Sequence, residues 1–248
     1  MFSYSRVSCF KQCPFLYFLR YIKKYTTTKS QDADNPLYLG SAIHLGLEKD
    51  VEEARKQYFN EFYLISDQQI NEFIKIEELL PRVKKLLPEG VNEVEIKTED
   101  FIGYIDRLVK TGDNTYDIYD YKYSNNVDNY MKSAQLHLYK YYFELTHPNC
   151  VVNNLYYVFI PKILIRQKKT ECLYQFRRRL IEELEKAEIK IERVEYDQSK
   201  VDEFLRDCKD LSTCEEFNKQ PTKLCNWCEF KDFCESNGEI NYNIIIND

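Results

Sequence analysis

The amino-acid sequence predicts an α/β fold, with a mixed central sheet flanked by helices, a helical N-terminal part and a cysteine-rich C-terminal segment. Three observations support this class. Apolar residues recur at helical spacing up to Gly90, and they alternate with polar residues after it. A helical stretch then separates two strand-like runs, as in a crossover between strands of one sheet. The 248 residues are 44% hydrophobic, which is enough for one good-sized domain or two small ones.

The N-terminal part, residues 1–90, is predicted to be helical. Its first helix is capped by a serine and kinks at Pro14, because proline lacks the N–H that an uninterrupted helix needs. Apolar residues at helical spacing predict a second helix over 40–60 and a third over 67–87. We expect this third helix to break near Pro81.

The middle part, residues 91–200, is predicted to contain the sheet. Three alternating runs with turn residues between them indicate consecutive strands in a meander, at 94–97, 101–109 and 116–123. A helix over 131–146 then leads to an apolar strand over 154–161. The remaining elements, in order, are a basic strand-like stretch to about Phe176, a charged helix, a strand over 189–196 and a helix over 199–217.

The charge distribution limits the partners. A formal net charge of −6 argues against a protein that coats nucleic acid without discrimination. Basic residues nevertheless cluster in two stretches, 1–31 and 162–179, which would suit a groove for a polyanion, although solvated helix faces explain such runs at least as often. The sequence has no apolar run of about 18 residues, so we expect no membrane segment and a cytoplasmic protein, in the host cytoplasm if the gene is viral.

Asp120 and Lys122 are the first candidates for chemistry. Strand side chains alternate, so both are expected on one face of a strand, while Asp117 faces the other way. An ion pair is the commoner explanation. A carboxylate that holds a divalent cation beside a lysine that steers a water is also what a metal-dependent phosphodiesterase needs. A hairpin would bring Asp106 from the preceding strand next to Asp120, and two such carboxylates repel unless a cation lies between them.

Three further side chains could complete this site. His44 follows Gly40 on a predicted helix, where an imidazole ligand would suit Mn²⁺ better than Mg²⁺, although most such histidines are buried and hydrogen-bonded. Gln135 and Tyr139 are four residues apart on the helix after the sheet and therefore share a face. That face is either an ordinary amphipathic surface or a means to hold DNA or to orient Lys122.

The cysteines point to a second metal centre. Three of the nine, Cys225, Cys228 and Cys234, form a C-x2-C-x5-C arrangement, and a tetrahedral site or a cubane cluster needs a fourth thiol. We expect Cys13 to supply this fourth thiol. Cys9 and Cys214 are the reserve ligands. The spacing alone does not separate zinc from iron-sulfur.

Seven features in this order resemble the RecB-type branch of the PD-(D/E)XK nucleases. The features are Ser3-x-Ser5, Cys13-Pro14, Gly40 to His44, Gly103 to Asp106, Asp120-Tyr121-Lys122, Gln135-x3-Tyr139, and Pro221-x3-Cys225-x2-Cys228-x5-Cys234. The resemblance covers nearly the whole chain. It is closest to the CRISPR-associated RecB-like exonucleases and the iron-sulfur nuclease domain of AddB.

The resemblance implies a single nuclease domain over 1–248. A restriction-endonuclease-like core over 91–200 would lie between the helical part, 1–90, and a segment over 201–248 that closes onto Cys13. A 4Fe-4S cluster would be held by Cys13, Cys225, Cys228 and Cys234. Mn²⁺ or Mg²⁺ would be held by His44, Asp106, Asp120 and the Tyr121 carbonyl, with Glu95 as a neighbour of the metal site. The implied catalytic residues are Asp106, Asp120, Lys122, Gln135 and Tyr139, and the implied nucleic-acid contacts are Ser5, Arg6, Arg20, Gln135 and Tyr139.

The implied function is that of a metal-dependent DNA exonuclease acting from single-stranded ends, in recombination, repair or CRISPR-adaptation-like processing. The alternative is a non-catalytic, accessory Fe-S protein that binds DNA ends and acts with a helicase or integrase partner. A complete set of Asp106, Asp120 and Lys122 favours the enzyme. Endonuclease activity, recombination partners and a homo-oligomer stay open.

Overall fold

The structure is a computed structural model that describes residues 1–239 and 244–246. The chain forms two compact units. The sheet unit comprises residues 31–96 and 104–196, and the cysteine unit comprises residues 1–30, 97–103 and 197–248. The predicted division of the chain into three parts of one domain stays a prediction.

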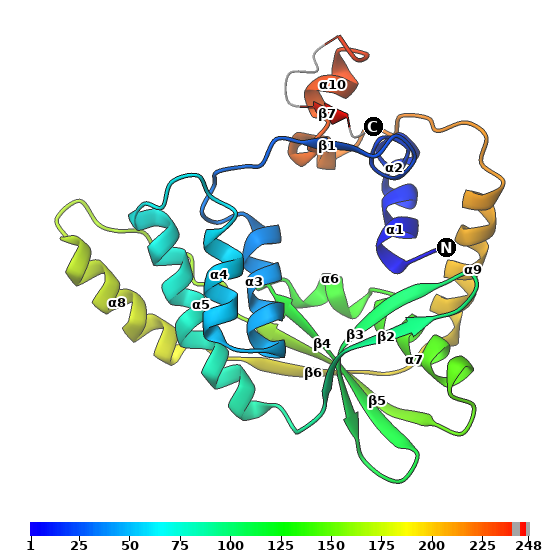
Figure 1. The fold of residues 1–248 in the computed structure, drawn as a ribbon, viewed down its shortest axis with the longest axis horizontal. Coiled ribbons are helices and arrows are strands. Elements are labelled where there is room, and N and C mark those ends of the chain that lie inside the picture. Colours follow the sequence, from blue (N-terminus) through cyan, green and yellow to red (C-terminus); the bar gives the residue numbers. More distant parts are fainter. Residues whose placement is uncertain (240–243, 247–248) are drawn as a thin grey trace. The chain divides into compact units, whose positions relative to one another are not determined.

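A mixed sheet is the centre of the fold (Figure 1). Its strands, in spatial order, are β2 (Val91–Lys97), β3 (Ile102–Lys110), β4 (Thr115–Tyr123), β5 (Val151–Ile160) and β6 (Lys190–Val194). Strand β4 is antiparallel to β3 and parallel to β5, and β5 is antiparallel to β6. The predicted meander, crossover and mixed sheet are therefore confirmed, and with them the α/β fold class.

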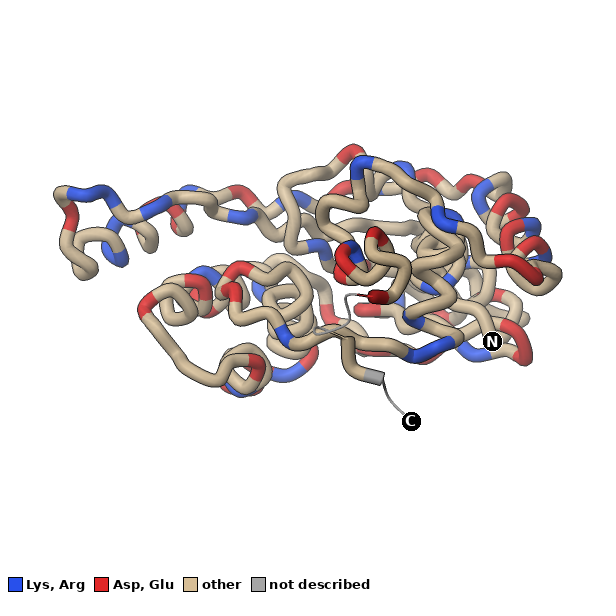
Figure 2. The backbone as a smooth tube through the Cα atoms, turned by 90° about the horizontal axis from the view of Figure 1, so that it is seen from above, with Lys and Arg blue, Asp and Glu red and all other residues tan. Residues whose placement is uncertain are grey.

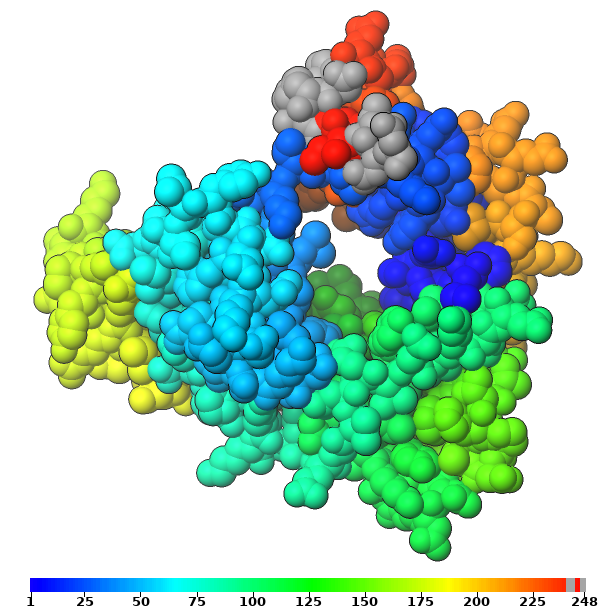
Figure 3. Space-filling model, viewed as in Figure 1, coloured from blue at the N-terminus to red at the C-terminus, as the bar shows by residue number. Residues whose placement is uncertain are grey.

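Helices cover both faces of the sheet. One group packs on the face of Tyr119 and Tyr121, where its apolar side chains form the main core. This group is α3 (Pro36–Glu48), α4 (Val51–Phe59), α5 (Asp67–Leu86) and α8 (Leu173–Lys186). The chain from α3 to α5, blue to cyan, lies together in Figures 1 and 3. The crossover from β4 to β5 runs through α6 (Val127–Met131) and α7 (Gln135–Thr146), and α7 packs on the opposite face.

The helix boundaries correct three of the predictions. The helix predicted over 40–60 is two helices, because the Asp50 side chain accepts from the backbone of Glu53 and starts a new one. The helix predicted over 131–146 is likewise divided between α6 and α7. Pro81 does not break α5, since its neighbours Leu79, Leu80 and Val83 are buried in the core while Pro81 faces solvent.

The stretch before α8 is also different from the prediction. Residues 161–172 adopt no regular secondary structure, although a strand-like stretch was expected there. The strand predicted over 189–196 is shorter, and the helix predicted over 199–217 ends at Ser212, because the backbone leaves the helical region at Thr213.

The cysteine unit is built from short elements. They are α1 (Tyr4–Gln12), α2 (Pro14–Tyr17), a π-helical turn (Phe18–Ile22), β1 (Tyr25–Thr27), α9 (Gln198–Ser212), a 3₁₀ turn (Lys223–Trp227), α10 (Lys231–Glu235) and β7 (Ile244–Ile246). Strands β1 and β7 pair antiparallel. Pro14 ends α1 and begins α2, which confirms the predicted kink. Within the described residues, no helix is long and apolar enough to cross a bilayer.

Candidate active site

The hairpin of β3 and β4 brings two carboxylates together. Arg107 lies opposite Tyr119 in the antiparallel ladder. Asp106 and Asp120, each one residue further along, therefore lie opposite each other on the two strands. The Asp106 Oδ2 atom accepts a 2.6 Å hydrogen bond from the backbone N–H of Tyr121. This bond fixes the Asp106 carboxylate beside the strand that carries Asp120.

His44 reaches the same place from α3. Its Nδ1 atom is 3.3 Å from Asp106 Oδ1, and its Nε2 atom is 3.2 Å from the carbonyl oxygen of Tyr121. The close approach that positions α3 occurs at Gly46 and not at Gly40, around which there is open space. A side chain at Gly46 would collide with Leu80.

Glu93 is a member of this site that the sequence reasoning missed. One ligand atom from each of His44, Glu93 and Asp106 lies within 4.8 Å of the others. Glu93 has a left-handed backbone, with φ of 51°, which is uncommon for a residue with a side chain. The neighbour that was expected at the metal, Glu95, instead accepts a 2.9 Å hydrogen bond from the hydroxyl of Tyr104.

Asp120 and Lys122 form a buried pair next to this group. Asp120 is fully buried, and its Oδ2 atom is 2.5 Å from Lys122 Nζ. Among the described residues, neither oxygen of Asp120 has a hydrogen bond of acceptable geometry. Asp120 is not a member of the trio of His44, Glu93 and Asp106, but the charges of Asp106 and His44 act on it. Together these carboxylates and the imidazole are donor types that fit Mn²⁺ or Mg²⁺.

Burial and neighbouring charges shift the protonation of these groups. Burial raises the pKa of Asp120 to about 6; the Lys122 ammonium opposes this rise and the Asp106 carboxylate adds to it. Burial opposes the charged form of His44, but the hydrogen bond and charge of Asp106 outweigh it and raise the His44 pKa. Burial opposes the charged form of Lys122, but the Asp120 and Asp106 carboxylates outweigh it and raise the Lys122 pKa.

In addition to Asp120, three side chains contact the Lys122 ammonium, and Tyr139 holds one of them. Its Nζ atom donates a 3.0 Å hydrogen bond to Gln135 Oε1, and Gln135 Nε2 donates a 2.8 Å bond to the hydroxyl of Tyr139. The ring centres of Tyr130 and Tyr157 are 5.4 and 5.7 Å from Nζ. The sequence predicted that Gln135 and Tyr139 share a face. Its residue spacing did not predict that Tyr130 and Tyr157 lie near Lys122.

Asp117, the rival acid of β4, has a different environment. It is buried on the opposite face of the strand, and its Oδ1 atom accepts hydrogen bonds of 3.1 and 2.9 Å from the backbone and side-chain amides of Asn154. These bonds tie β4 to β5. Asp117 therefore binds a neutral amide, whereas Asp120 faces a lysine and a second carboxylate.

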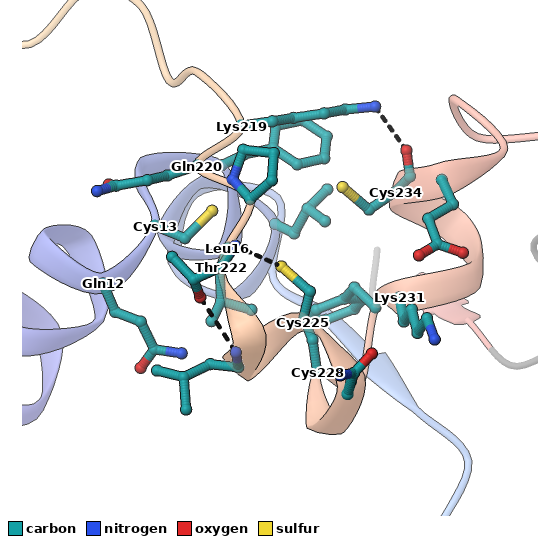
Figure 4. Close-up of a pocket in the computed structure, with 17 residues that line it drawn as sticks. Gln12, Cys13, Leu16, Lys219, Gln220, Thr222, Cys225, Cys228, Lys231 and Cys234 are labelled. Atoms are coloured by element: carbon teal, nitrogen blue, oxygen red, sulfur yellow. Dashed lines mark hydrogen bonds between the residues drawn. The ribbon is translucent and has the colours of Figure 1, made fainter.

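The cysteine unit holds a separate pocket. Its volume is about 440 Å³, and Cys13, Cys225, Cys228 and Cys234 all line it (Figure 4). Figure 4 shows three of their sulfur atoms around the same space, and the backbone of Thr222 donates to the Cys225 sulfur at 3.4 Å. Burial raises the pKa values of Cys228 and Cys234, and neighbouring thiols add to the rise. Four thiols in a largely apolar pocket fit a thiophilic metal centre.

The two reserve cysteines lie elsewhere. Cys9 is buried beside this pocket, in a core cluster with Leu16 and Phe230. Its sulfur is 3.9 Å from Arg20 Nη1. Cys214 is not among the residues that line the pocket, and its thiol donates to the carbonyl oxygen of Glu216.

The three N-terminal residues expected to contact nucleic acid are in the cysteine unit. Ser5 Oγ is 3.1 Å from the hydroxyl of Ser3, and Arg6 donates to the carbonyl oxygen of Met1 at 2.9 Å. Arg20 donates two hydrogen bonds to one carboxylate oxygen of Glu229, at 2.9 and 2.6 Å. The charge of Arg20 is thus already paired, and the role of these residues in binding nucleic acid stays a prediction.

Comparisons with known proteins agree with this geometry. Residues 1–235 match the family described as the PD-(D/E)XK nuclease superfamily. The fold is similar to a crystal structure of a "Putative exonuclease" from Eubacterium rectale, with a TM-score of 0.54 at 14% identity over 91% of each chain. A second structure, SSO0001, has a TM-score of 0.36 at 13% identity over 80% of this chain and 85% of its own. No curated protein matched. The family match covers 235 of the 248 residues, and the chain therefore belongs to the PD-(D/E)XK nuclease superfamily.

Proposed function

We propose that this nuclease is a metal-dependent deoxyribonuclease that degrades DNA from single-stranded ends. The observation that carries the proposal is the position of Asp106 between a His44–Glu93 pair and the buried Asp120, with Lys122 beside Asp120. The family supplies nuclease activity, a divalent metal ion and a DNA substrate. The preference for ends is supported by the resemblance to RecB-type exonucleases.

Four side chains would hold the metal in this proposal. They are His44, Glu93, Asp106 and Asp120, with the Tyr121 carbonyl as a further oxygen ligand next to His44 Nε2. A divalent cation bound there would polarise the scissile phosphate and lower the pKa of a water molecule. One oxygen of Asp120 lies beside the Lys122 ammonium, and the other has no partner among the described residues, which leaves it available as a metal ligand.

Lys122 would stabilise the charge that develops on the phosphate oxygens. Its raised pKa keeps the ammonium protonated at neutral pH. The hydrogen bond to Gln135 and the two tyrosine rings fix where that charge is, so little reorganisation is needed during the reaction.

The cysteine pocket would hold a 4Fe-4S cluster. Four cysteines line one pocket, and Cys13 joins the other three from the far end of the sequence. Four thiols suit either a zinc ion or a cubane cluster. The order of the motifs resembles the RecB-like branch, and this resemblance favours the cluster.

The catalytic proposal is tested with end-labelled and circular single-stranded DNA in the presence of Mn²⁺. Wild type should shorten the linear strand from an end and leave the circle intact. Asp120→Ala should abolish the reaction, while Asp113→Ala, in the exposed turn between β3 and β4, should not change it. Cleavage of the linear strand by Asp120→Ala at the wild-type rate would contradict the assignment, and cleavage of the circle would make the enzyme an endonuclease.

The cluster is tested by anaerobic purification followed by absorption spectroscopy and metal analysis. We expect a broad visible band that bleaches on reduction, with iron and acid-labile sulfide in equal amounts. Cys228→Ala should lose both, and Cys150→Ala, outside the pocket, should keep them. Stoichiometric zinc without a visible band would contradict the cluster and leave the nuclease proposal standing.

A further inference from the structure

We infer that residues 162–169, here called the basic strap, form a binding track for a single DNA strand that leads to the active site. The inference rests on the proposed nuclease function and names where its substrate is held. The strap belongs to the sheet unit, as the active site does, and contains Lys162, Arg166, Lys168 and Lys169 without any acid.

The strap follows β5 and begins next to the end of β4, the strand that carries Asp120 and Lys122. Ile160, the last residue of β5, pairs with Tyr123, the residue after Lys122. Two hydrogen bonds then join the two chain segments: Asn125 Nδ2 donates to the Lys162 carbonyl oxygen at 2.9 Å, and the Lys162 N–H donates to Asn125 Oδ1 at 2.8 Å. The Lys162 ammonium lies 5.3 Å from the centre of the Tyr123 ring.

The strap has no regular secondary structure, but contacts with the rest of the sheet unit hold it in place. Ile163 and Ile165 pack against the main core, and Leu164 between them is 78% exposed. At its far end Arg179 donates to the Arg166 carbonyl oxygen at 2.9 Å and to both carboxylate oxygens of Glu171 at 2.8 Å. A segment that is already ordered loses less conformational entropy when it binds a ligand.

The strap has three exposed cations without an ion-pair partner among the described residues, although the Glu171 carboxylate lies near one of them and accepts a 3.0 Å hydrogen bond from the Lys168 N–H. In the basic cluster predicted from the sequence, the three arginines of α8 each pair with an acid: Arg177 with Asp67, Arg178 with Glu182 and Arg179 with Glu171. Within the described part of the chain, Arg166, Lys168 and Lys169 have no ion pair, and all three are exposed. At the left of Figure 2, basic positions recur along the stretch that leads to α8.

These properties fit a single strand of DNA. Unpaired cations along such a track attract a phosphate backbone. Leu164 and Tyr174, 78% and 75% exposed on and just beyond the strap, offer apolar surface to unstacked bases, which a duplex keeps covered. The track starts next to Tyr123 and Asn125, just past Lys122 along the chain, so a strand bound along it would run toward the end of β4 that carries the acidic site.

The test removes the three unpaired charges together. The variant Arg166→Gln/Lys168→Gln/Lys169→Gln is compared with Lys85→Gln/Lys110→Gln/Lys190→Gln, which removes three exposed lysines elsewhere on the sheet unit. Binding of fluorescent oligothymidylate is measured by anisotropy over a range of salt concentrations, with EDTA present so that no strand is cut. The strap variant should bind about tenfold more weakly, and the slope of log affinity against log salt should fall by roughly 2. The control variant should behave as wild type.

A second readout separates this inference from the nuclease proposal. Hydrolysis of bis(p-nitrophenyl) phosphate with Mn²⁺ needs the metal site but no DNA track, so the strap variant should keep the wild-type rate. Wild-type binding and salt slope in the strap variant, an equal loss in the control, or a loss of diester hydrolysis would each overturn the inference. If wild type does not hydrolyse the diester, the proposed function fails while the binding result still decides the role of the strap.

Discussion

The acidic site of the sheet unit and the cysteine pocket of the cysteine unit are built in different ways. The acidic residues come from two strands of one hairpin, from the strand beside it and from a helix packed on the same sheet, and protein hydrogen bonds already hold Asp106 and Lys122. The pocket joins Cys13 to Cys225, Cys228 and Cys234 through turns and short helices. Backbone pairing therefore assembles the first site, whereas the second depends much more on what binds there.

The largest effect expected from this difference concerns Asp120. Asp120→Asn should lower the rate of DNA hydrolysis by on the order of a thousandfold or more, because a metal ligand and the partner of Lys122 are both lost. Steady-state assays with Mn²⁺ check this. The same change should make the metal-free protein more stable at neutral pH, because burial and the Asp106 charge together outweigh the Lys122 ammonium and disfavour the ionised carboxylate.

The raised pKa of Asp120 predicts how the stability of the folded protein changes with pH. The pKa of Asp120 is raised to about 6 in the folded protein, from 3.8 for an ordinary aspartate. The folded state therefore binds this proton more tightly, and the contribution of Asp120 to stability is lost as pH rises from about 4 to about 6. The loss reaches on the order of 2 to 3 kcal/mol. Thermal unfolding with EDTA should show wild type and Asp120→Asn converging at acidic pH; an equal gap at every pH would contradict the buried charge.

The next effect should fall on the cysteine unit alone. Cys234→Ser should lose the bound metal centre and destabilise the cysteine unit by several kcal/mol, because binding energy contributes to folding there. Hydrolysis of bis(p-nitrophenyl) phosphate by the sheet unit should change little. Metal analysis, thermal unfolding and the diester assay together check this. Cys150→Ser is the matched control, and a parallel loss of diester hydrolysis in Cys234→Ser would show that the two regions are not assembled independently.

A smaller effect is expected at Glu93, and Glu95 on the same strand serves as its control. Glu93→Gln should raise the Mn²⁺ concentration for half-maximal activity by about tenfold or more, as expected when an acid at a metal site is neutralised. Glu95→Gln, the same change two residues away, should have no effect because Glu95 binds Tyr104. Glu93→Gly should lose metal affinity but gain up to about 1 kcal/mol of stability, since glycine relieves the left-handed backbone. Equal metal dependence in the two glutamine variants would remove Glu93 from the site.

The sequence predicted most of this architecture where the local rules hold. Alternation along β3 and β4 placed Asp106 beside Asp120, and the change of period at Gly90 located the start of the sheet. Glu93 could not be found in that way, because no glycine or asparagine marks its left-handed backbone and alternation assumes a regular strand.

Two errors in the helices have opposite causes. The Asp50 cap was readable, since an aspartate followed three residues later by a glutamate is a typical helix start. A proline inside a helix predicts a break, but core packing of the residues around Pro81 maintains α5 through it. The tyrosines around Lys122 come from separate elements, and only the tertiary fold brings them together.

The smallest effects should come from the residues that hold Lys122. Gln135→Leu removes a hydrogen bond to a charged group, worth about 1.5 to 3 kcal/mol, and should lower kcat by roughly ten- to a hundredfold with little change in KM. Tyr139→Phe removes only a neutral bond to Gln135 and should lower kcat a few-fold. Because Tyr139 contacts Lys122 only through Gln135 in this bond chain, the double variant should be no slower than Gln135→Leu. Additive losses would instead mean that Tyr139 acts on the substrate by itself.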